Sequence, residues 1–168
     1  MDKSLSLSRA IATVFGVGTL RPAPGTWGSL AALPIFYLIH VTGGFPLVVV
    51  ATCAIFGLGW WATAEQTRNS LDHDPSEIVI DEVVGQWLAL WSISASAWRL
   101  EIDVLQLWPG WLTGFALFRL FDILKPGPVG WADRRQDALG VMLDDVIAGV
   151  CAAVCVVALA AVAHGVLM

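Results

Sequence analysis

The chain has 168 residues, of which 57% are hydrophobic and only 14% charged, and its mean hydropathy is +0.74. Soluble domains carry about 25% charged residues and could not bury so much apolar surface, so an ordinary soluble protein is excluded. The net charge of −5 comes from acidic residues clustered in short segments and gives no reason to expect a nucleic-acid partner. The length suits one all-α membrane domain over residues 1–168, a helical bundle with four to five membrane segments.

The N-terminal residues up to about Phe15 predict a short helix. Apolar side chains from Leu7 onward fall at helical spacing, so we expect this helix to lie on the membrane surface. Gly16 and Gly18 follow and are expected to make the chain more flexible.

Five apolar segments follow, separated by glycines, prolines or charged residues, and each predicts a membrane helix. They run over residues 27–41, 45–64, 83–98, 107–124 and 146–167. Pro34 strains the first of them, so a helix that enters the membrane without crossing it is the alternative there.

The basic residues predict the orientation of these segments. If the five segments alternate in direction, one face carries all the basic residues except Arg99, which places that face in the cytoplasm. The residues on it are Lys3, Arg9, Arg21, Arg68, Arg119, Lys125, Arg134 and Arg135. The same arrangement leaves only Glu101 and Asp103 among the acidic residues of these connections on the opposite face. Carboxylates from distant parts of the sequence are therefore expected to converge on the cytoplasmic rim.

Two pairs of adjacent carboxylates stand at segment ends. Asp81 and Glu82 lie at the entry to the third segment, and Asp144 and Asp145 begin the last one, with apolar residues on both sides. Adjacent carboxylates at the edge of hydrocarbon are costly unless cations or a metal ion compensate them. The alternative is helix capping, which needs only one acid of each pair.

The end of the fourth segment places two cations beside one carboxylate. Arg119, Asp122 and Lys125 step by three residues, so they share a helix face before Pro126 stops the helix. As a structural element this is an intrahelical salt-bridge ladder. As a functional site it offers phosphate-binding cations beside a metal ligand.

A loop rich in glycine and proline, residues 16–29, leads into the first segment. Thr26 is expected to cap the following helix, and backbone N–H groups near Gly25 would then be free to bind an anion. The loop lacks the GK[ST] ending of a P-loop, and a simple turn is the alternative.

Hard oxygen ligands without a cysteine or histidine cluster favour Mg²⁺ over zinc. The three cysteines lie in apolar runs and are interpreted as small hydrophobic residues. His40 and His164 lie in or near apolar segments on the outward side and are expected to take no part in chemistry. His73, between two aspartates, is better placed but is expected to be a solvated loop residue.

Four segments, in this order, resemble the bacterial phosphatidylglycerophosphatase A family: GVGTLRPAPGTWGSL, IVIDEVVGQWLAL, FRLFDILKPGPVGWADR and GVMLDDVIAGV. Four ordered motifs that span nearly the whole chain are far more specific than one. The resemblance implies a Mg²⁺-dependent phosphatase of the bacterial inner membrane, with several membrane passes and an active site facing the cytoplasm. Its substrate would be phosphatidylglycerophosphate, whose terminal phosphate it removes to give phosphatidylglycerol.

The resemblance also implies site residues, and a mechanism follows as a hypothesis. The motif residues are Gly25, Thr26, Asp74, Asp81, Glu82, Gly85, Arg119, Asp122, Lys125, Pro126, Asp144 and Asp145. The carboxylates among them would hold one or two Mg²⁺ ions that activate a water for direct attack on the phosphate, with Asp81 or Asp144 as general base. Arg119 and Lys125 would hold phosphate oxygens, and Gly25 and Thr26 would help to bind the substrate.

Two other functions remain open from the sequence. Another Mg²⁺-dependent lipid-headgroup enzyme, such as a CDP-alcohol phosphotransferase, would also place aspartates at a membrane rim, but the DGxxAR-type run of that family is absent. A small transporter would bind cations at the rim acids without chemistry, and charges at the membrane midplane would support it. The pattern gives no indication of an oligomeric state.

Overall fold

The computed structural model describes residues 7–68, 70, 72 and 74–167, with the last two of these described in their backbone alone. Within these residues the chain is helical and has no strand, as the composition predicts. The helices are α1 (Leu7–Ala12), α2 (Pro24–Thr67), α3 (Ile80–Ala89), α4 (Trp91–Leu100), α5 (Trp108–Leu124), α6 (Pro128–Asp133) and α7 (Ala138–Leu167), with 3₁₀ helices η1 (Val17–Thr19) and η2 (Val104–Leu107). Lys3, predicted to lie on the cytoplasmic face, and His73, predicted to be a solvated loop residue, lie outside the described residues.

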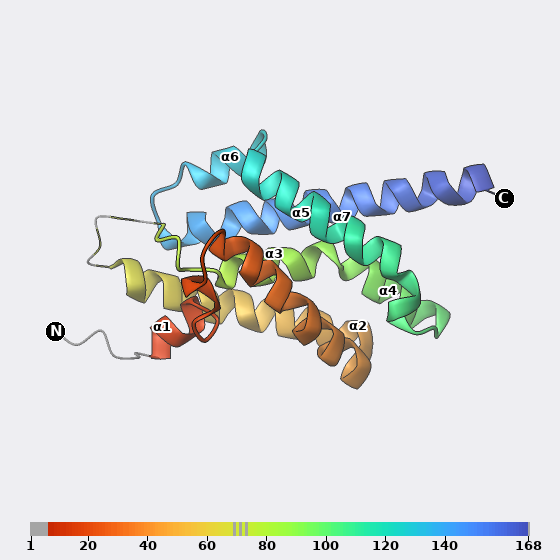
Figure 1. Ribbon diagram of the computed structural model, residues 1–168, viewed down its shortest axis with the longest axis horizontal. Coiled ribbons are helices and arrows are strands. Elements are labelled where there is room, and N and C mark those ends of the chain that lie inside the picture. The colour runs from red at the N-terminus through yellow and green to blue at the C-terminus, as the bar shows by residue number, and fades with distance from the viewer. Residues whose placement is uncertain (1–6, 69, 71, 73, 168) are drawn as a thin grey trace.

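Gly44 divides α2 into two arms. Its φ of 62° and ψ of −161° are not helical, and Figure 1 shows the chain turning back within α2, so that the two arms lie side by side. A side chain is excluded here because φ lies in the left-handed region and an added Cβ would overlap the indole ring of Trp98. Pro46 follows in the first turn of the second arm, where a missing N–H costs little. The first two predicted segments correspond to these two arms.

The third predicted segment is broken in the structure. Leu90 separates α3 from α4, and its φ of −95° and ψ of −1° tighten the chain locally. Its N–H donates to the Trp87 carbonyl at 3.1 Å, three residues back, as in a 3₁₀ turn. The sequence predicted one continuous helix over this stretch, and no glycine or proline marks the break.

Helix α3 lies at the centre of the bundle and packs against both α2 and α7. Glycines allow the close approach to α7: a Cβ on Gly85 would lie 2.6 Å from the carbonyl oxygen of Asp145, and one on Gly149 would lie 3.0 Å from the Cβ of Leu88. Small residues at a helix crossing let the two backbones come together. The first turn of α3 is therefore held beside the early turns of α7.

Helices α2 and α7 are long and apolar enough to cross a membrane, with mean hydropathies of 2.0 and 2.8 over their most apolar windows. Only 17% and 22% of those windows are buried inside the molecule. Core helices of soluble proteins bury most of such a surface. Large apolar side chains are also exposed along α5, including Leu112, Leu120 and Ile123. These features suggest a membrane protein.

The N-terminal helix is shorter than the sequence predicts. Helix α1 ends at Ala12, because Val14 and Phe15 have positive φ angles of 49° and 53°. The segment packs on the loop before α3, where the Val79 N–H donates to the Ala12 carbonyl at 2.9 Å. This contact brings the glycine-rich loop next to the start of α3.

Candidate active site

Five carboxylates from three helices converge to form what we term the carboxylate cluster: Asp81, Glu82, Asp122, Asp144 and Asp145. Asp81 and Glu82 lie in the first turn of α3, and Asp122 lies in the last turn of α5. Oxygen atoms of Asp81, Glu82 and Asp145 lie within 4.8 Å of one another, as do those of Asp122, Asp144 and Asp145. Asp145 belongs to both groups of three and so joins them. The sequence predicted this convergence.

The carboxylate cluster is buried. Asp81, Asp144 and Asp145 are 7%, 6% and 2% exposed. Among the described residues, Oε2 of Glu82 and Oδ1 of Asp145 are buried without a hydrogen-bond partner. Burying carboxylate oxygens without a partner costs several kcal/mol unless a cation compensates them. The cluster could therefore hold a metal ion.

The position of Asp144 and Asp145 differs from the prediction that they begin the last helix. Helix α7 begins at Ala138, so the pair lies in its second turn. Asp137 accepts a hydrogen bond from the Gly140 N–H at 2.7 Å, as an N-terminal capping residue does. Capping therefore does not account for Asp144 and Asp145.

Arg119 lies between the carboxylates of α3 and α5. Its Nη1 is 2.6 Å from Oδ2 of Asp122 and 3.9 Å from Oε1 of Glu82. Its Nε is buried and has no partner among the residues that the structure describes. Two carboxylates thus hold the guanidinium in place, and one of its N–H donors is left unused.

The sequence predicted that Lys125 shares a helix face with Arg119 and Asp122. The structure shows that it does not. Helix α5 ends at Leu124, before Pro126, and Lys125 adopts a left-handed conformation with φ of 46°. Its Nζ contacts the carboxylate of Asp133 and lies 2.9 Å from Oδ2 of Asp144. Partial burial lowers the pKa of Lys125, but the hydrogen bonds to the two carboxylates outweigh it and raise the pKa above its ordinary value. Lys125 is therefore a permanent cation of the site.

The glycine-rich loop contacts the carboxylate cluster through Gly25. A Cβ on Gly25 would overlap the carboxylate of Glu82 and lie 3.1 Å from Nη2 of Arg119. Ser29 Oγ donates to the Gly25 carbonyl at 2.9 Å and accepts from Nη1 of Arg119 at 3.4 Å. Ser29 thus links the loop to Arg119, the cation next to the carboxylate cluster.

Thr26 does not cap the helix that follows the loop. Helix α2 begins at Pro24, and Ala23 occupies the capping position with a φ of 59° and no side-chain hydrogen bond. Proline fits the first helical turn, so the helix starts three residues earlier than the sequence predicted. Thr26 lies half-buried in that first turn, next to Gly25.

Asp74 lies outside the two groups of converging carboxylates. It is exposed, and with Asp133, Arg135 and Asp144 it lines a pocket of about 290 Å³. Partial desolvation raises the pKa of Asp74, and the nearby Lys125 opposes this rise. Since Asp144 is common to the pocket and the cluster, the pocket adjoins the buried carboxylates at Asp144.

Comparison with known proteins identifies the family. A family model described as Phosphatidylglycerophosphatase A matches residues 10–160. The chain belongs to the phosphatidylglycerophosphatase A family. All four motifs that carry the resemblance contribute residues to the site described above, which lies within the matched range.

Three curated proteins are similar to this chain in sequence. A phosphatidylglycerophosphatase A of Haemophilus influenzae is 36% identical over 94% of this chain and 93% of its own length. One of Escherichia coli is 33% identical over 85% of this chain and 77% of its own length. A protein of Bacteroides thetaiotaomicron named putative phosphatidylinositol-3-phosphatase is 35% identical over 89% of this chain and 91% of its own length. No solved structure matches the chain.

Two residues of the site, Asp133 and Ser29, were not predicted from the sequence. Asp133 contacts Lys125, which also pairs with Asp144. The sequence pattern that could have indicated Asp133 is the group of polar residues that follows Pro126. Ser29 accepts a hydrogen bond from Arg119 and so links it to the loop. The pattern that could have indicated Ser29 is a single hydroxyl residue at the start of an apolar segment. Neither pattern is specific enough to assign a role without the fold.

Proposed function

We propose that the protein hydrolyses the terminal phosphate monoester of phosphatidylglycerophosphate, giving phosphatidylglycerol and phosphate in phospholipid biosynthesis. The observation that carries this proposal is the meeting of five carboxylates with Arg119 and Lys125 at one end of the bundle. Phosphate monoester hydrolysis is among the slowest uncatalysed reactions, and its catalysis depends on positioned charge. Family membership supports the same activity.

We infer that Mg²⁺ is the cofactor. All the donors in the cluster are carboxylate oxygens, the ligand type that Mg²⁺ prefers, and two of those oxygens are buried without partners among the described residues. Asp81, Glu82, Asp122, Asp144 and Asp145 would hold the ion or ions, with Asp74 at the edge of the adjoining pocket. The bound ion would neutralise phosphoryl oxygens and increase the acidity of water.

The residues of the chain have separate tasks in this proposal. Arg119 and Lys125 bind phosphate oxygens, and Gly25 and Thr26 position the headgroup at the start of α2. Asp81 or Asp144 accepts a proton from the attacking water, whose oxygen forms a bond to phosphorus. The bond from phosphorus to the glycerol oxygen breaks, and that oxygen gains a proton to give the alcohol.

Direct attack by water is favoured over a covalent intermediate on a cysteine or histidine. Cys151 and Cys155 lie further along α7, and Cys53 lies in the second arm of α2, none of them in the carboxylate cluster. His40 lines a different pocket. The carboxylate cluster, together with Arg119 and Lys125, offers groups that can position both water and phosphate.

We propose five membrane crossings in the bacterial inner membrane, with the carboxylate cluster facing the cytoplasm. The two arms of α2, the broken α3–α4 helix, α5 and α7 would be the crossings, and α1 would lie at the interface. An arm of 20 residues spans about 30 Å, which suits the hydrocarbon thickness of a bilayer. The excess of basic residues on the cluster side supports this orientation.

A different lipid phosphate is the second candidate substrate, because one relative is named a putative phosphatidylinositol-3-phosphatase. Phosphate release from phosphatidylglycerophosphate, phosphatidylinositol 3-phosphate and phosphatidic acid by the purified protein would distinguish them. We expect kcat/KM to be at least about tenfold higher for phosphatidylglycerophosphate. A preference for another lipid would replace the substrate, whereas no release from any of them would favour cation transport.

A further inference from the structure

A second pocket lies at the end of the bundle away from the carboxylate cluster. It has a volume of about 540 Å³ and is lined by residues that include Tyr37, His40, Trp98, Glu101, Ile102 and Asp103. Figure 1 shows the turn of α2 and the connection from α4 to α5 at one end, with the starts of α3 and α7 at the other. The pocket is therefore separate from the proposed active site.

The walls of this pocket are fixed by backbone geometry. Trp98 packs its ring against Gly44 at the turn of α2, where no side chain would fit. Glu101 ends α4 in a left-handed conformation with φ of 53°, and Asp103 accepts a hydrogen bond from the Leu105 N–H at 2.8 Å. The backbone thus places both residues at the pocket, and the hydrogen bond from Leu105 holds the carboxylate of Asp103.

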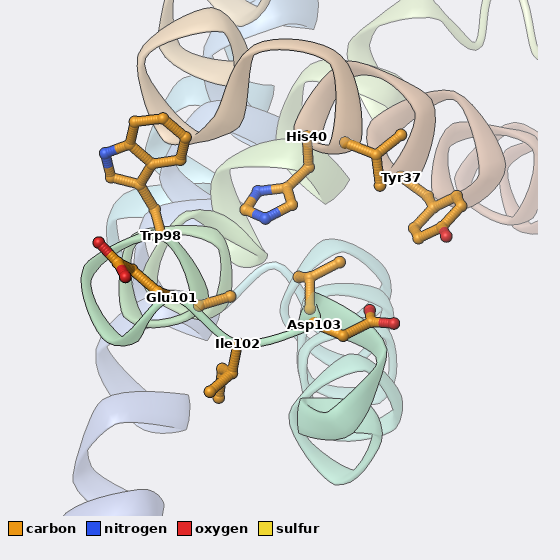
Figure 2. A pocket seen from close by; sticks show the side chains of 9 residues that line it. Tyr37, His40, Trp98, Glu101, Ile102 and Asp103 are labelled. Atoms are coloured by element: carbon orange, nitrogen blue, oxygen red, sulfur yellow. The ribbon is translucent and has the colours of Figure 1, made fainter.

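His40 forms the centre of the pocket. Figure 2 shows its ring between Trp98 and Glu101 on one side and Asp103 and Tyr37 on the other. Its Nδ1 hydrogen-bonds Ser94 Oγ at 2.7 Å, and the residue is only 9% exposed. No other hydrogen bond to His40 occurs among the described residues, so Nε2 is left to face a ligand.

A nucleophilic Ser–His–Asp arrangement does not explain these residues. Ser94 is fully buried, so no substrate can reach its hydroxyl group. A metal site does not explain them either. Within the described part of the chain, no set of three ligand atoms that includes His40, Glu101 or Asp103 converges within 4.8 Å.

The charge of the pocket points to an organic cation. Glu101 and Asp103 form no ion pair with a described residue, and Arg99 is the one basic residue at this end of the described chain. Carboxylates next to aromatic rings are a favourable setting for an ammonium group. Neutral imidazole nitrogen can accept one of its hydrogen bonds.

We propose that this pocket binds the ammonium headgroup of a zwitterionic phospholipid. A lipid is favoured over a soluble amine because Val41 and Trp98, which also line the pocket, are 53% and 54% exposed and offer apolar surface to acyl chains. The proposal rests on the membrane placement proposed above, which puts the pocket at the interface opposite the active site. It does not depend on the identity of the phosphatase substrate.

The test measures lipid retention by the full-length protein in detergent, using native mass spectrometry. Phosphatidylethanolamine is compared with its N-acetyl derivative, which has the same phosphate and acyl chains but no ammonium. We expect about fivefold greater retention of the ammonium lipid. The Glu101→Gln/Asp103→Asn variant should lose this preference, while Glu65→Gln, which alters an exposed carboxylate elsewhere, should keep it.

Asparagine at position 103 can still accept the Leu105 N–H, and the melting temperature of each variant reports its fold. Equal retention of the two lipids by the wild type would overturn the proposal without any variant. A preference that persists in the folded double variant would overturn it as well. Displacement of the lipid by millimolar ethanolamine would identify a soluble amine as the ligand instead. Phosphatase activity is measured on the same samples, so its absence would be recognised as failure of the proposed function alone.

Discussion

Lys125 links three helices: its Nζ lies 2.9 Å from Oδ2 of Asp144 on α7 and contacts Asp133 on α6, while its backbone ends α5. Asp133 and Asp144, the two partners of Lys125, both line the pocket beside the carboxylate cluster. In the proposed function this lysine binds an oxygen of the substrate phosphate. The first prediction follows from this position.

Lys125→Met should lower kcat for phosphate release by about 10²–10³-fold, because it removes a positioned cation from the charge that develops on phosphate. Lys125→Arg should retain more activity. The raised pKa keeps Lys125 protonated, so its deprotonation should not reduce activity below about pH 10. Arg99→Met changes an exposed cation at the other end of the bundle and is the control. Near-normal kcat in folded Lys125→Met would remove Lys125 from the mechanism.

Asp145→Asn should weaken metal binding most strongly, because Asp145 belongs to both groups of converging carboxylates. Thermal melting with and without Mg²⁺ measures this directly, since saturation at 100 times Kd stabilises a protein by about 2.7 kcal/mol. Without metal the variant should be at least as stable as wild type, because a buried carboxylate oxygen without a described partner is lost. Glu65→Gln serves as the control. Unchanged stabilisation by Mg²⁺ in Asp145→Asn would show that the cluster does not bind the ion.

Gly85→Ala should separate α3 from α7 and disturb the cluster that their contact assembles. The added Cβ would lie 2.6 Å from the Asp145 carbonyl and overlap the ring of Phe118. We expect a loss of about 1–3 kcal/mol in stability together with reduced metal binding. Gly57→Ala is a matched control, because a Cβ there meets nothing within 4 Å. Equal stability of the two variants would contradict the tight crossing.

The proposed orientation predicts which loops reach each side of the membrane. In a chain whose three cysteines are replaced by alanine, Gln106→Cys should react with a membrane-impermeant maleimide in intact spheroplasts. Ser76→Cys, before α3, should react only after lysis, because one crossing separates the two exposed positions. Labelling of both in intact spheroplasts would rule out the crossing between them, and the reverse pattern would invert the orientation.

The sequence predicts the helices and the members of the carboxylate cluster because both depend on local patterns. Long apolar runs favour membrane helices, and paired acids at their ends are too costly to lack a function. The break at Leu90 had no signal, since ordinary residues surround it and packing decides the geometry. The partners of Lys125 could not be predicted either, because its left-handed conformation turns the side chain toward Asp133 and Asp144.

Thr26 shows another way in which sequence reasoning failed, and His40 has a setting that the sequence does not reveal. A threonine before an apolar run is a common helix cap, but Pro24 starts the helix earlier and displaces it from that position. His40 was interpreted as uninvolved because it lies within an apolar run. Its setting depends on Glu101 and Asp103, which reach it only through the turn after α4.

The most direct test of the carboxylate cluster is phosphate release from phosphatidylglycerophosphate by protein freed of metal with EDTA and then titrated with Mg²⁺. We predict that activity returns with Mg²⁺ in the wild type and that Asp81→Asn and Asp144→Asn fall by at least about 10²-fold at saturating metal. Asp103→Asn, which alters a carboxylate at the opposite end, should match the wild type. Activity that survives metal removal, or that is retained by both folded cluster variants, would contradict the account.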